Sequence, residues 1–415
     1  MDSTELYRQL LGVATPWTVD RVEMDVHGLS VDVYLAHSGG TRFACPKCGQ
    51  SSPVYDHLAE RRWRHLDSCH FRTVLHAHPP RIQCATDGVL QVELPWAEPG
   101  GRFTRMFESL AIDVLLATDV KNAAAILNIT WDEAWHLMQR AVIRGRAAKG
   151  GKLPRLMGVD EKSYAKRHKY VTVVYDLDGA TVEYVGRGRE FSSLGAYFKA
   201  FETQALQGIE GIALDMCQAY INACNHFVPL AHTKMVFDRF HIMSQMLDAV
   251  DRVRKRENRE LQRQGDTTLA KSRYLWLYSP ENMPSKAAER FKGLKEANLR
   301  TARAWAIKES LRELWTYTSQ TWAHKFWQRW HFWATHSRLP EVIKVAKLIR
   351  THLDGVMCYF KHRITNAVAE GLNSKIATIQ KRAYGFRNLD NFMTAIYFHC
   401  GGLDLWPHRL THREV

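Results

Sequence analysis

An apolar run that ends on an acidic residue is the strongest constraint on the fold of this chain. The run Leu156–Asp160 is followed by strand-forming runs over 169–177 and 181–186. These patterns predict a meander of three antiparallel strands, with Asp178-Gly179 at a type I′ turn. A carboxylate at the end of a strand lies at the rim of a sheet, where it either begins a turn or holds a metal ion.

A second apolar run that ends on aspartate follows the meander. We predict a helix over 193–205, a strand over 209–215 that ends on Asp215, a helix over 216–227 and a strand over 234–238. This element order is that of a ribonuclease-H-like α/β fold. Its first and fourth strands are neighbours, so Asp160 and Asp215 are expected to lie side by side.

A long helical segment over 242–355 then interrupts the predicted fold as a large all-α insertion. It contains Trp residues at spacings that fit buried helical faces. We expect a packed insertion with these rings in its core; stacking of the rings on extruded bases is the alternative.

A third acidic residue stands alone in a basic segment. Between Gly355 and Leu389 the only carboxylate is Glu370. On a helix it would lie beside Asn366 and Asn373, nearly opposite an apolar stripe. The predicted stripe consists of Ile364, Val368, Leu372, Ile376 and Ile379. The helical positions leave two interpretations open: Glu370 lies either on a solvated face or on a face turned toward metal ions and phosphate.

The first 100 residues are rich in strand and turn formers and predict a small β module. Cys45-Pro-Lys-Cys48-Gly49 has the spacing of a zinc knuckle, and Cys84-Ala-Thr-Asp87-Gly88 repeats it with Asp in place of the usual Cys or His. We predict a Zn²⁺ site at Cys45, Cys48, Cys84 and Asp87. Three residues between the halves are alternative ligands: His57, Cys69 and His70. Ordinary thiols beside turns are the other reading.

Residues 102–150 are predicted to be helical, with helices over 107–117, 120–127 and 131–144. Thr130-Trp-Asp-Glu133 has the pattern of a capping box. Two short helices with basic flanks predict a helix-turn-helix that binds DNA; an ordinary helical hairpin is the alternative. The flanking DNA contacts are predicted at Arg140, Arg144 and Arg146. The run Arg61-Arg62-Trp-Arg64 is either a phosphate-contacting segment or a solvated face.

The charge balance favours a polyanionic partner. Fifty-seven Lys and Arg against 43 Asp and Glu give a formal net charge of +14, and phosphate contacts take their strength from basic residues. No stretch approaches 18 apolar residues, and the start of the chain lacks a basic region followed by an apolar one. We therefore expect a cytosolic nucleic-acid-binding protein without a membrane partner. Eight cysteines are too sparse for a disulfide scaffold.

Taken in order, the motifs resemble those of the insertion-sequence transposases of the ISL3 type over nearly the whole chain. The motifs are Cys45-x-x-Cys48, Leu94-Pro-Trp-Ala97, Arg102-Phe-Thr104, the helix-turn-helix, Gly158-Val-Asp-Glu-Lys-Ser163, Ala213-Leu-Asp-Met216, Phe237-Asp-Arg-Phe-His241 and Asn366-Ala-Val-Ala-Glu370-Gly-Leu-Asn-Ser374.

The resemblance implies a catalytic triad at Asp160, Asp215 and Glu370. It also implies that Asp238-x-x-His241 supports the site or positions DNA, and we expect Asn366 and Asn373 to do the same. Ligands that are all oxygen favour Mg²⁺ or Mn²⁺ over zinc at such a centre.

The implied reaction is metal-dependent strand cleavage at terminal inverted repeats, followed by strand transfer into target DNA. The implied partners are double-stranded DNA and further copies of the chain, in a homodimer or higher synaptic complex, in the bacterial cytoplasm near the nucleoid. The rival functions are a DNA-binding regulator without catalysis and a structure-specific nuclease on the same fold.

The predicted domains are a zinc module, a helix-turn-helix domain, a catalytic domain in two parts around the insertion, and a tail. Their predicted bounds are 1–100, 101–150, 151–241 with 356–400, 242–355 for the insertion, and 401–415 for the tail.

Overall fold

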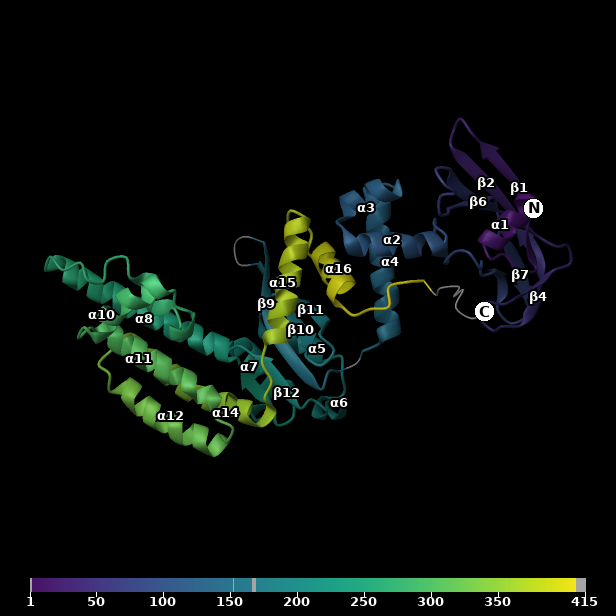
Figure 1. The fold of residues 1–415 in the computed structure, drawn as a ribbon. Coiled ribbons are helices and arrows are strands. Elements are labelled where there is room, and N and C mark those ends of the chain that lie inside the picture. Colours follow the sequence, from purple (N-terminus) through teal and green to yellow (C-terminus); the bar gives the residue numbers. More distant parts are fainter. Residues whose placement is uncertain (1, 152, 166–168, 408–415) are drawn as a thin grey trace. The chain divides into compact units, whose positions relative to one another are not determined.

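The computed structural model describes residues 2–151, 153–165 and 169–407 (Figure 1). The chain divides into two compact units, one formed by residues 1–150 with 403–415 and the other by residues 151–402. Residues 408–415 of the predicted tail lie outside the described residues. No helix in the described part of the chain is long and apolar enough to cross a membrane.

The first unit begins with α1 (Ser3–Leu10) and two four-stranded sheets, ordered β1-β2-β6-β5 and β3-β4-β7-β8. Side chains of both sheets, including Trp63, Leu75 and Ile82, share one buried core. The β-rich module predicted from the turn residues is therefore built around a single core. The strands are β1 (Trp17–Asp25), β2 (Ser30–His37), β3 (Arg42–Ala44), β4 (Ser51–His57), β5 (Arg61–Arg64), β6 (Arg72–Ala77), β7 (Pro80–Cys84) and β8 (Gly88–Gln91).

Three helices follow in the same unit: α2 (Arg105–Ala117), α3 (Val120–Leu127) and α4 (Trp131–Lys149). Asn128 ends α3 in the left-handed region, with φ of 52°. The predicted capping box is confirmed: the Glu133 N–H donates to Thr130 Oγ1 (3.2 Å) and the Thr130 N–H donates to the Glu133 carboxylate (2.9 Å). Helix α4 runs five residues beyond the predicted end at Arg144.

The second unit contains a five-stranded mixed sheet ordered β11-β10-β9-β12-β13. The strands are β9 (Leu156–Ala165), β10 (Lys169–Asp176), β11 (Thr181–Arg187), β12 (Gly211–Leu214) and β13 (Met235–Phe237). The first three pair antiparallel, whereas β12 runs parallel to both β9 and β13. The predicted neighbourhood of the first and fourth strands is confirmed.

Two local predictions about this sheet are wrong. Strand β9 does not end at Asp160 but continues to Ala165, because β10 pairs with it over its whole length. The predicted type I′ turn is also absent: the left-handed residue is Ala180, with φ of 51°, whereas the Asp176 carboxylate accepts from the N–H groups of Asp178 and Gly179. The side-chain acceptor fixes a longer loop than the Asp-Gly signature predicts.

Helices cover both faces of the sheet. Met157 and Val159 of β9 point into the main core, with α5 (Phe191–Phe198), α6 (Thr203–Gln207) and α7 (Gln218–Phe227). The alternate face carries Gly158 and is covered by α15 (Ala367–Arg382), while α16 (Leu389–Cys400) packs on β11. In Figure 1 these last two helices, in yellow, lie beside the β9–β11 meander. The predicted single helix over 193–205 is thus two helices.

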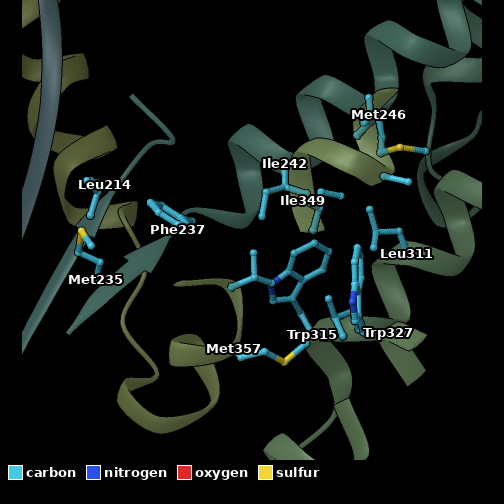
Figure 2. Close-up of a cluster of buried hydrophobic side chains, with 14 of the residues drawn as sticks. Leu214, Met235, Phe237, Ile242, Met246, Leu311, Trp315, Trp327, Ile349 and Met357 are labelled. Carbon is cyan, nitrogen blue, oxygen red and sulfur yellow. The ribbon is translucent and has the colours of Figure 1, made fainter. Parts of the chain in front are cut away.

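The insertion is helical, as predicted, and its core is continuous with that of the sheet. Figure 2 shows Leu214 and Phe237 at one side of the cluster and Trp315 and Trp327 at the other, with Ile242 of α8 between them. Trp305 and Trp330 are buried too, whereas Trp322 and Trp333 are exposed.

The remaining elements are η1 (Ala231–Thr233), α8 (Arg239–Arg263), α9 (Arg273–Leu277), η2 (Pro280–Asn282), α10 (Ser285–Glu296), α11 (Arg300–Arg312), η3 (Glu313–Thr316), α12 (Gln320–Thr335), α13 (Pro340–Thr351) and α14 (Leu353–His362).

Candidate functional site: two acids on adjacent strands, a cysteine–aspartate cluster and a helix-turn-helix

The two predicted zinc knuckles meet in the first unit. One ligand atom from each of Cys45, Cys48, Cys84 and Asp87 lies within 4.8 Å of all the others. The Cys48 and Cys84 sulfurs are 3.5 Å apart, and Asp87 Oδ2 is 3.4 Å from Cys45 Sγ and 3.7 Å from Cys84 Sγ. Ligands on a tetrahedral Zn²⁺ stand about 3.5–3.8 Å apart, given Zn–S of about 2.3 Å and Zn–O of about 2.0 Å. The four residues therefore fit a zinc ion.

The backbone conformation and the backbone N–H groups around these four residues favour metal binding. Gly49 and Gly88 follow the two knuckles with φ of 74° and 77°, a conformation that glycine adopts without strain. The N–H groups of Asp87 and Thr86 lower the pKa of the Cys84 thiol, since their hydrogen bonds favour the thiolate. The alternative ligands lie outside the cluster: His57 Nε2 contacts His37 Nε2 at 2.8 Å, and Cys69 and His70 do not join the four.

The predicted DNA-contacting arginines of the helix-turn-helix are mostly engaged inside the first unit. Arg140 and Arg144 both pair with Glu98 (3.0 and 2.7 Å) and lie near Glu108 (3.4 and 3.6 Å), a residue that is 1 % exposed. Burial raises the pKa of the Glu108 carboxyl, and the two guanidinium groups oppose that rise. Arg140 and Arg144 therefore stabilise the fold, because they neutralise a buried acid. Arg146 is exposed.

Replacing Arg144 with alanine is expected to destabilise the first unit by about 3 kcal/mol, because Glu108 would remain buried with half of its compensation removed. Arg144 also donates to the Leu405 carbonyl at 2.5 Å, and that contact would be lost as well. Chemical denaturation of the full chain measures the change. Lys121→Ala, at an exposed lysine of α3, is the matched control and should change stability by less than about 0.5 kcal/mol. Equal effects of the two variants would contradict this role of Arg144.

Of the three arginines in β5, Arg64 is buried, Arg61 is partly buried and Arg62 is exposed. Arg64 is 5 % exposed; its guanidinium donates to the carbonyls of His65 and Thr73 and pairs with Asp67. A phosphate contact by Arg64 would require this network to open, so the prediction for Arg64 is not supported. Arg61 donates to the Gly101 carbonyl, and Arg62 is exposed.

At the sheet of the second unit, the register places two of the predicted acids side by side. Strand β12 pairs with β9 at Gly211–Leu156, Ile212–Met157 and Ala213–Gly158. Extended by two residues, this register sets Asp215 opposite Asp160 on the same face. Asp215 is held in place by the Cys217 N–H, which donates to its Oδ1 at 3.0 Å.

The carboxylate of Asp160 is fixed from two sides. The Glu161 N–H donates to Oδ1 and Asn373 Nδ2 donates to Oδ2, each at 2.8 Å. Burial raises the pKa of this carboxyl. The nearby charges of Asp215 and Asp238 raise it further, whereas the Glu161 N–H and the charge of His241 lower it. These shifts place Asp238 and His241 of the predicted acid-x-x-His element in the electrostatic field of Asp160.

Asn373 links α15 to the sheet. Besides its bond to Asp160, its Oδ1 accepts from the Tyr175 hydroxyl at 2.8 Å and its backbone carbonyl accepts from Lys162 at 3.1 Å. Gly158 permits this approach, since a Cβ there would stand 3.5 Å from the Ala369 methyl and 3.0 Å from Asn366 Oδ1. The helix face that carries the two predicted Asn residues is therefore turned toward β9 rather than toward solvent.

Glu370 lies in the first turn of α15, at the flank of that face, and is exposed. In the described residues, the cluster of Cys45, Cys48, Cys84 and Asp87 is the one group of three or more Cys, His, Asp or Glu whose ligand atoms all lie within 4.8 Å. Asp160, Asp215 and Glu370 are thus not drawn into a closed cluster. The predicted apolar stripe is partly wrong: the buried residues of α15 are Ala369 and Ile376, because the docked face is defined by the Asn residues.

A small cavity joins Asp238 and Asn366. Asp238 begins α8, with its Oδ1 accepting from the Phe240 N–H at 3.0 Å. Its Oδ2 and Asn366 Oδ1 are buried and find no hydrogen-bond partner in the described part of the chain. Both residues line a cavity of about 10 Å³, which is about the space of one water molecule. A bridging water would connect the start of α15 to the end of β13.

The sequence prediction did not single out Glu161. It follows Asp160 on the opposite face of β9, 3.7 Å from Arg189. Burial raises its pKa, and the charges of Asp215 and Asp160 add to the rise. The signal in the sequence was the second acid of the Asp-Glu pair, which directly follows the apolar run that begins β9.

Comparisons with known proteins agree with this architecture. Residues 157–396 match the family model of the ISL3 transposases, described as a transposase. Residues 41–87 match the zinc finger of the transposases of IS204, IS1001, IS1096 and IS1165, and residues 92–142 match the helix-turn-helix domain of transposase family ISL3.

Two curated relatives extend over nearly the full chain. The transposase for insertion sequence element IS1001 of Bordetella parapertussis is 28% identical over 396 residues, which cover 93% of this chain and 96% of the relative. The transposase for insertion sequence element IS1557 of Mycobacterium tuberculosis is 24% identical over an alignment of 446 positions that covers both chains completely. The matched catalytic segment includes both acidic strands and α15, and it spans more than half of the chain; the protein therefore belongs to the ISL3 family of insertion-sequence transposases and is a DDE transposase.

Proposed function

We propose that Asp160, Asp215 and Glu370 form the catalytic triad and hold Mg²⁺, or Mn²⁺, during cleavage and joining of DNA. The observation that carries this proposal is the hydrogen bond from Asn373 to Asp160, one helical turn beyond Glu370. It ties the helix of the third acid to the strand of the first. Carboxylate oxygens are the ligands that these ions prefer.

Some residues of the site would bind the metal ions, and others orient the carboxylates that bind them. Asp160 and Asp215 present carboxylates from adjacent strands, each oriented by a backbone N–H. Glu370 enters from the flank of α15, and Asn373 keeps the second oxygen of Asp160 in place. When bound, the divalent ions supply Lewis-acid stabilisation of the attacking and leaving oxygens. Water serves as the nucleophile for cleavage, and the freed 3′-hydroxyl serves as the nucleophile for attack on target DNA.

We propose that the zinc module and the helix-turn-helix bind the terminal inverted repeats. The exposed side chains of α3 and the first turns of α4, including Lys121, Trp131 and His136, are the candidates for groove contacts. Arg62 and Arg146 remain candidates for phosphate contacts. Binding should weaken steeply with salt, because phosphate contacts release counterions.

The wider setting follows from the reaction. Two transposon ends must be brought together, so a homodimer or higher synaptic complex on double-stranded DNA is proposed, in the bacterial cytoplasm near the nucleoid. The domain division also remains a proposal: zinc module over 1–100, helix-turn-helix over 101–150, catalytic parts over 151–241 and 356–400, insertion over 242–355 and tail over 401–415.

The test is a donor plasmid that carries the repeats flanking the gene, incubated with the protein, Mg²⁺ and a target plasmid. We expect nicks at the repeat ends and joined donor–target products, both mapped by sequencing. Cleavage without joining and without preference for repeats would identify a structure-specific nuclease. Binding without any cleavage would identify a regulator.

Replacing Asn373 with leucine is expected to reduce the rate of end cleavage about 10- to 100-fold, because Asp160 would lose the donor that orients it toward the metal. The Mg²⁺ concentration for half-maximal cleavage should rise. Ser374→Ala, at the exposed neighbour, is the control and should leave the titration unchanged. An unaltered Mg²⁺ titration of the leucine variant would show that Asn373 does not position a metal ligand.

A further inference from the structure

The turn that follows α15 carries a tyrosine that folding does not explain. Tyr384 is 100% exposed, and its φ of 52° lies in the left-handed region. Hydrogen bonds from the Tyr384 N–H to the Lys381 carbonyl (3.0 Å) and from the Gly385 N–H to the Gln380 carbonyl (2.9 Å) close the end of the helix. Glycine is the usual residue at such a left-handed helix end, since it has no Cβ to clash. The tyrosine therefore strains the backbone through its Cβ, and its ring buries no apolar surface.

An open cleft of about 700 Å³ lies at this turn, within the range of about 300–1,000 Å³ that is typical of ligand sites. The lining residues include Tyr164, Gln380, Tyr384, Phe386 and Arg387. The fully buried ring of Phe392 contacts the rings of Phe386 and Tyr164, at centroid distances of 5.2 and 6.2 Å. Gln380 Nε2 donates to the Tyr164 carbonyl at 2.9 Å. The aromatic wall of the cleft is thus preformed.

Three exposed cations lie at the cleft or next to its lining in the sequence. Arg387 lines the cleft, and Lys381 and Arg382 adjoin the lining residues Gln380 and Ala383. None of the three cations forms an ion pair with any residue that the structure describes. The sequence from 371 to 388 contains no acid that could neutralise them. A preformed aromatic wall beside these cations suits a base attached to a phosphate backbone.

The cleft lies on the elements that carry the proposed triad. Asp160 and Tyr164 both lie on β9, four residues or about 13 Å apart along the strand. Tyr384 lies two residues beyond the end of α15 and fourteen residues after Glu370, which is at most about 21 Å at the rise of an α-helix. A DNA strand advances about 3.4 Å per nucleotide. DNA held at the triad would therefore pass the cleft about four to six nucleotides away from the phosphate that is cut.

We propose that this cleft receives an unstacked nucleobase of the transposon-end DNA, with Tyr384 stacked on the base and the three cations on the flanking phosphates. The assignment rests on the proposed function for its ligand, since the DNA is the end that the triad cuts. Stacking on an aromatic side chain tolerates any base, so the cleft contributes affinity and strand distortion rather than sequence recognition. Extrusion of the base would bend or open the duplex near the cleavage site.

The test uses the full chain and a duplex that carries the end of its own element. Unstacked bases are detected by permanganate reactivity at thymines and by 2-aminopurine fluorescence at adenines. With the native chain and with Tyr384→Phe, we expect one unstacked position about four to six nucleotides from the cleavage site. Tyr384→Gly should abolish that signal and weaken DNA binding about 10-fold. The thermal stability of this variant should hold or rise, because glycine relieves the left-handed strain.

Two controls keep the outcomes separate. Tyr274→Ala removes another exposed tyrosine, from α9, and should change neither signal nor affinity. Tyr384→Asn also tolerates the left-handed region and lacks a ring, so it should repeat the glycine result. A signal that persists at native affinity in both ring-deleted variants would overturn the assignment, as would its absence in the native chain. Absence of Mg²⁺-dependent cleavage with the unstacking signal intact would instead refute the proposed function.

Discussion

Replacing Asp160 with asparagine is expected to abolish Mg²⁺-dependent cleavage of the donor plasmid while leaving binding to the repeat ends intact. The rate of cleavage should fall by more than the roughly 100-fold upper limit expected for Asn373→Leu. Asp160→Asn removes a metal ligand, whereas Asn373→Leu removes only the hydrogen bond that orients that ligand. The fold should not suffer. Burial and two neighbouring acids already raise the pKa of this carboxyl, so a neutral side chain of the same shape relieves repulsion. Its NH2 group replaces one of the two oxygens that accept from Glu161 and Asn373, and this loss opposes the gain. The melting temperature is therefore expected to change little.

The matched control is Asp178→Asn, the same chemical change at an exposed residue of the β10–β11 loop. It should retain native cleavage. Glu370→Gln should repeat the Asp160→Asn result, with cleavage lost and binding kept, if α15 supplies the third ligand. Native cleavage by Asp160→Asn would refute the triad; native cleavage by Glu370→Gln alone would remove only the third member.

Replacing Cys84 with serine is expected to release zinc, melt the β module and abolish binding to the repeat ends. Cys84 is buried, and its sulfur lies within 4 Å of both Cys48 and Asp87. Structural zinc contributes about 10–16 kcal/mol of apparent binding energy in small zinc modules, so its loss outweighs the stability of the module. Zinc content measured by a chromogenic chelator, together with a thermal melt, reports both effects.

Cys69→Ser provides the control, since Cys69 is exposed in the same module and lies outside the cluster. It should keep both zinc and stability. Asp87→Cys should retain zinc because thiolate is the commoner structural ligand, whereas Asp87→Ala should weaken zinc binding. Zinc retained by Cys84→Ser, or lost equally from Cys69→Ser, would contradict the assignment of the four ligands.

The helix-turn-helix illustrates where residue type alone misleads. The capping box at Thr130 could be read from the sequence, since it depends on two side chains three residues apart. The partners of Arg140 and Arg144 could not, because Glu98 and Glu108 come from other segments and only packing makes Glu108 an acid that must be neutralised. The sequence alone therefore predicted that Arg140 and Arg144 contact DNA, whereas in the folded chain they neutralise the buried Glu108.

By itself, the sequence determined the order of the elements, the two acidic strands and the paired knuckles, because each depends on local periodicity or on fixed short spacing. Only the tertiary structure decided which face of α15 docks on β9, since the helical positions allowed either the apolar stripe or the face with the two Asn residues to be buried. Gly158, with no Cβ, leaves room for Asn366 at the start of this face, and Asn373 of the same face donates to Asp160. The strained backbone and exposed ring of Tyr384 could likewise not be predicted from the sequence, because exposure and a left-handed φ arise only when the chain has folded.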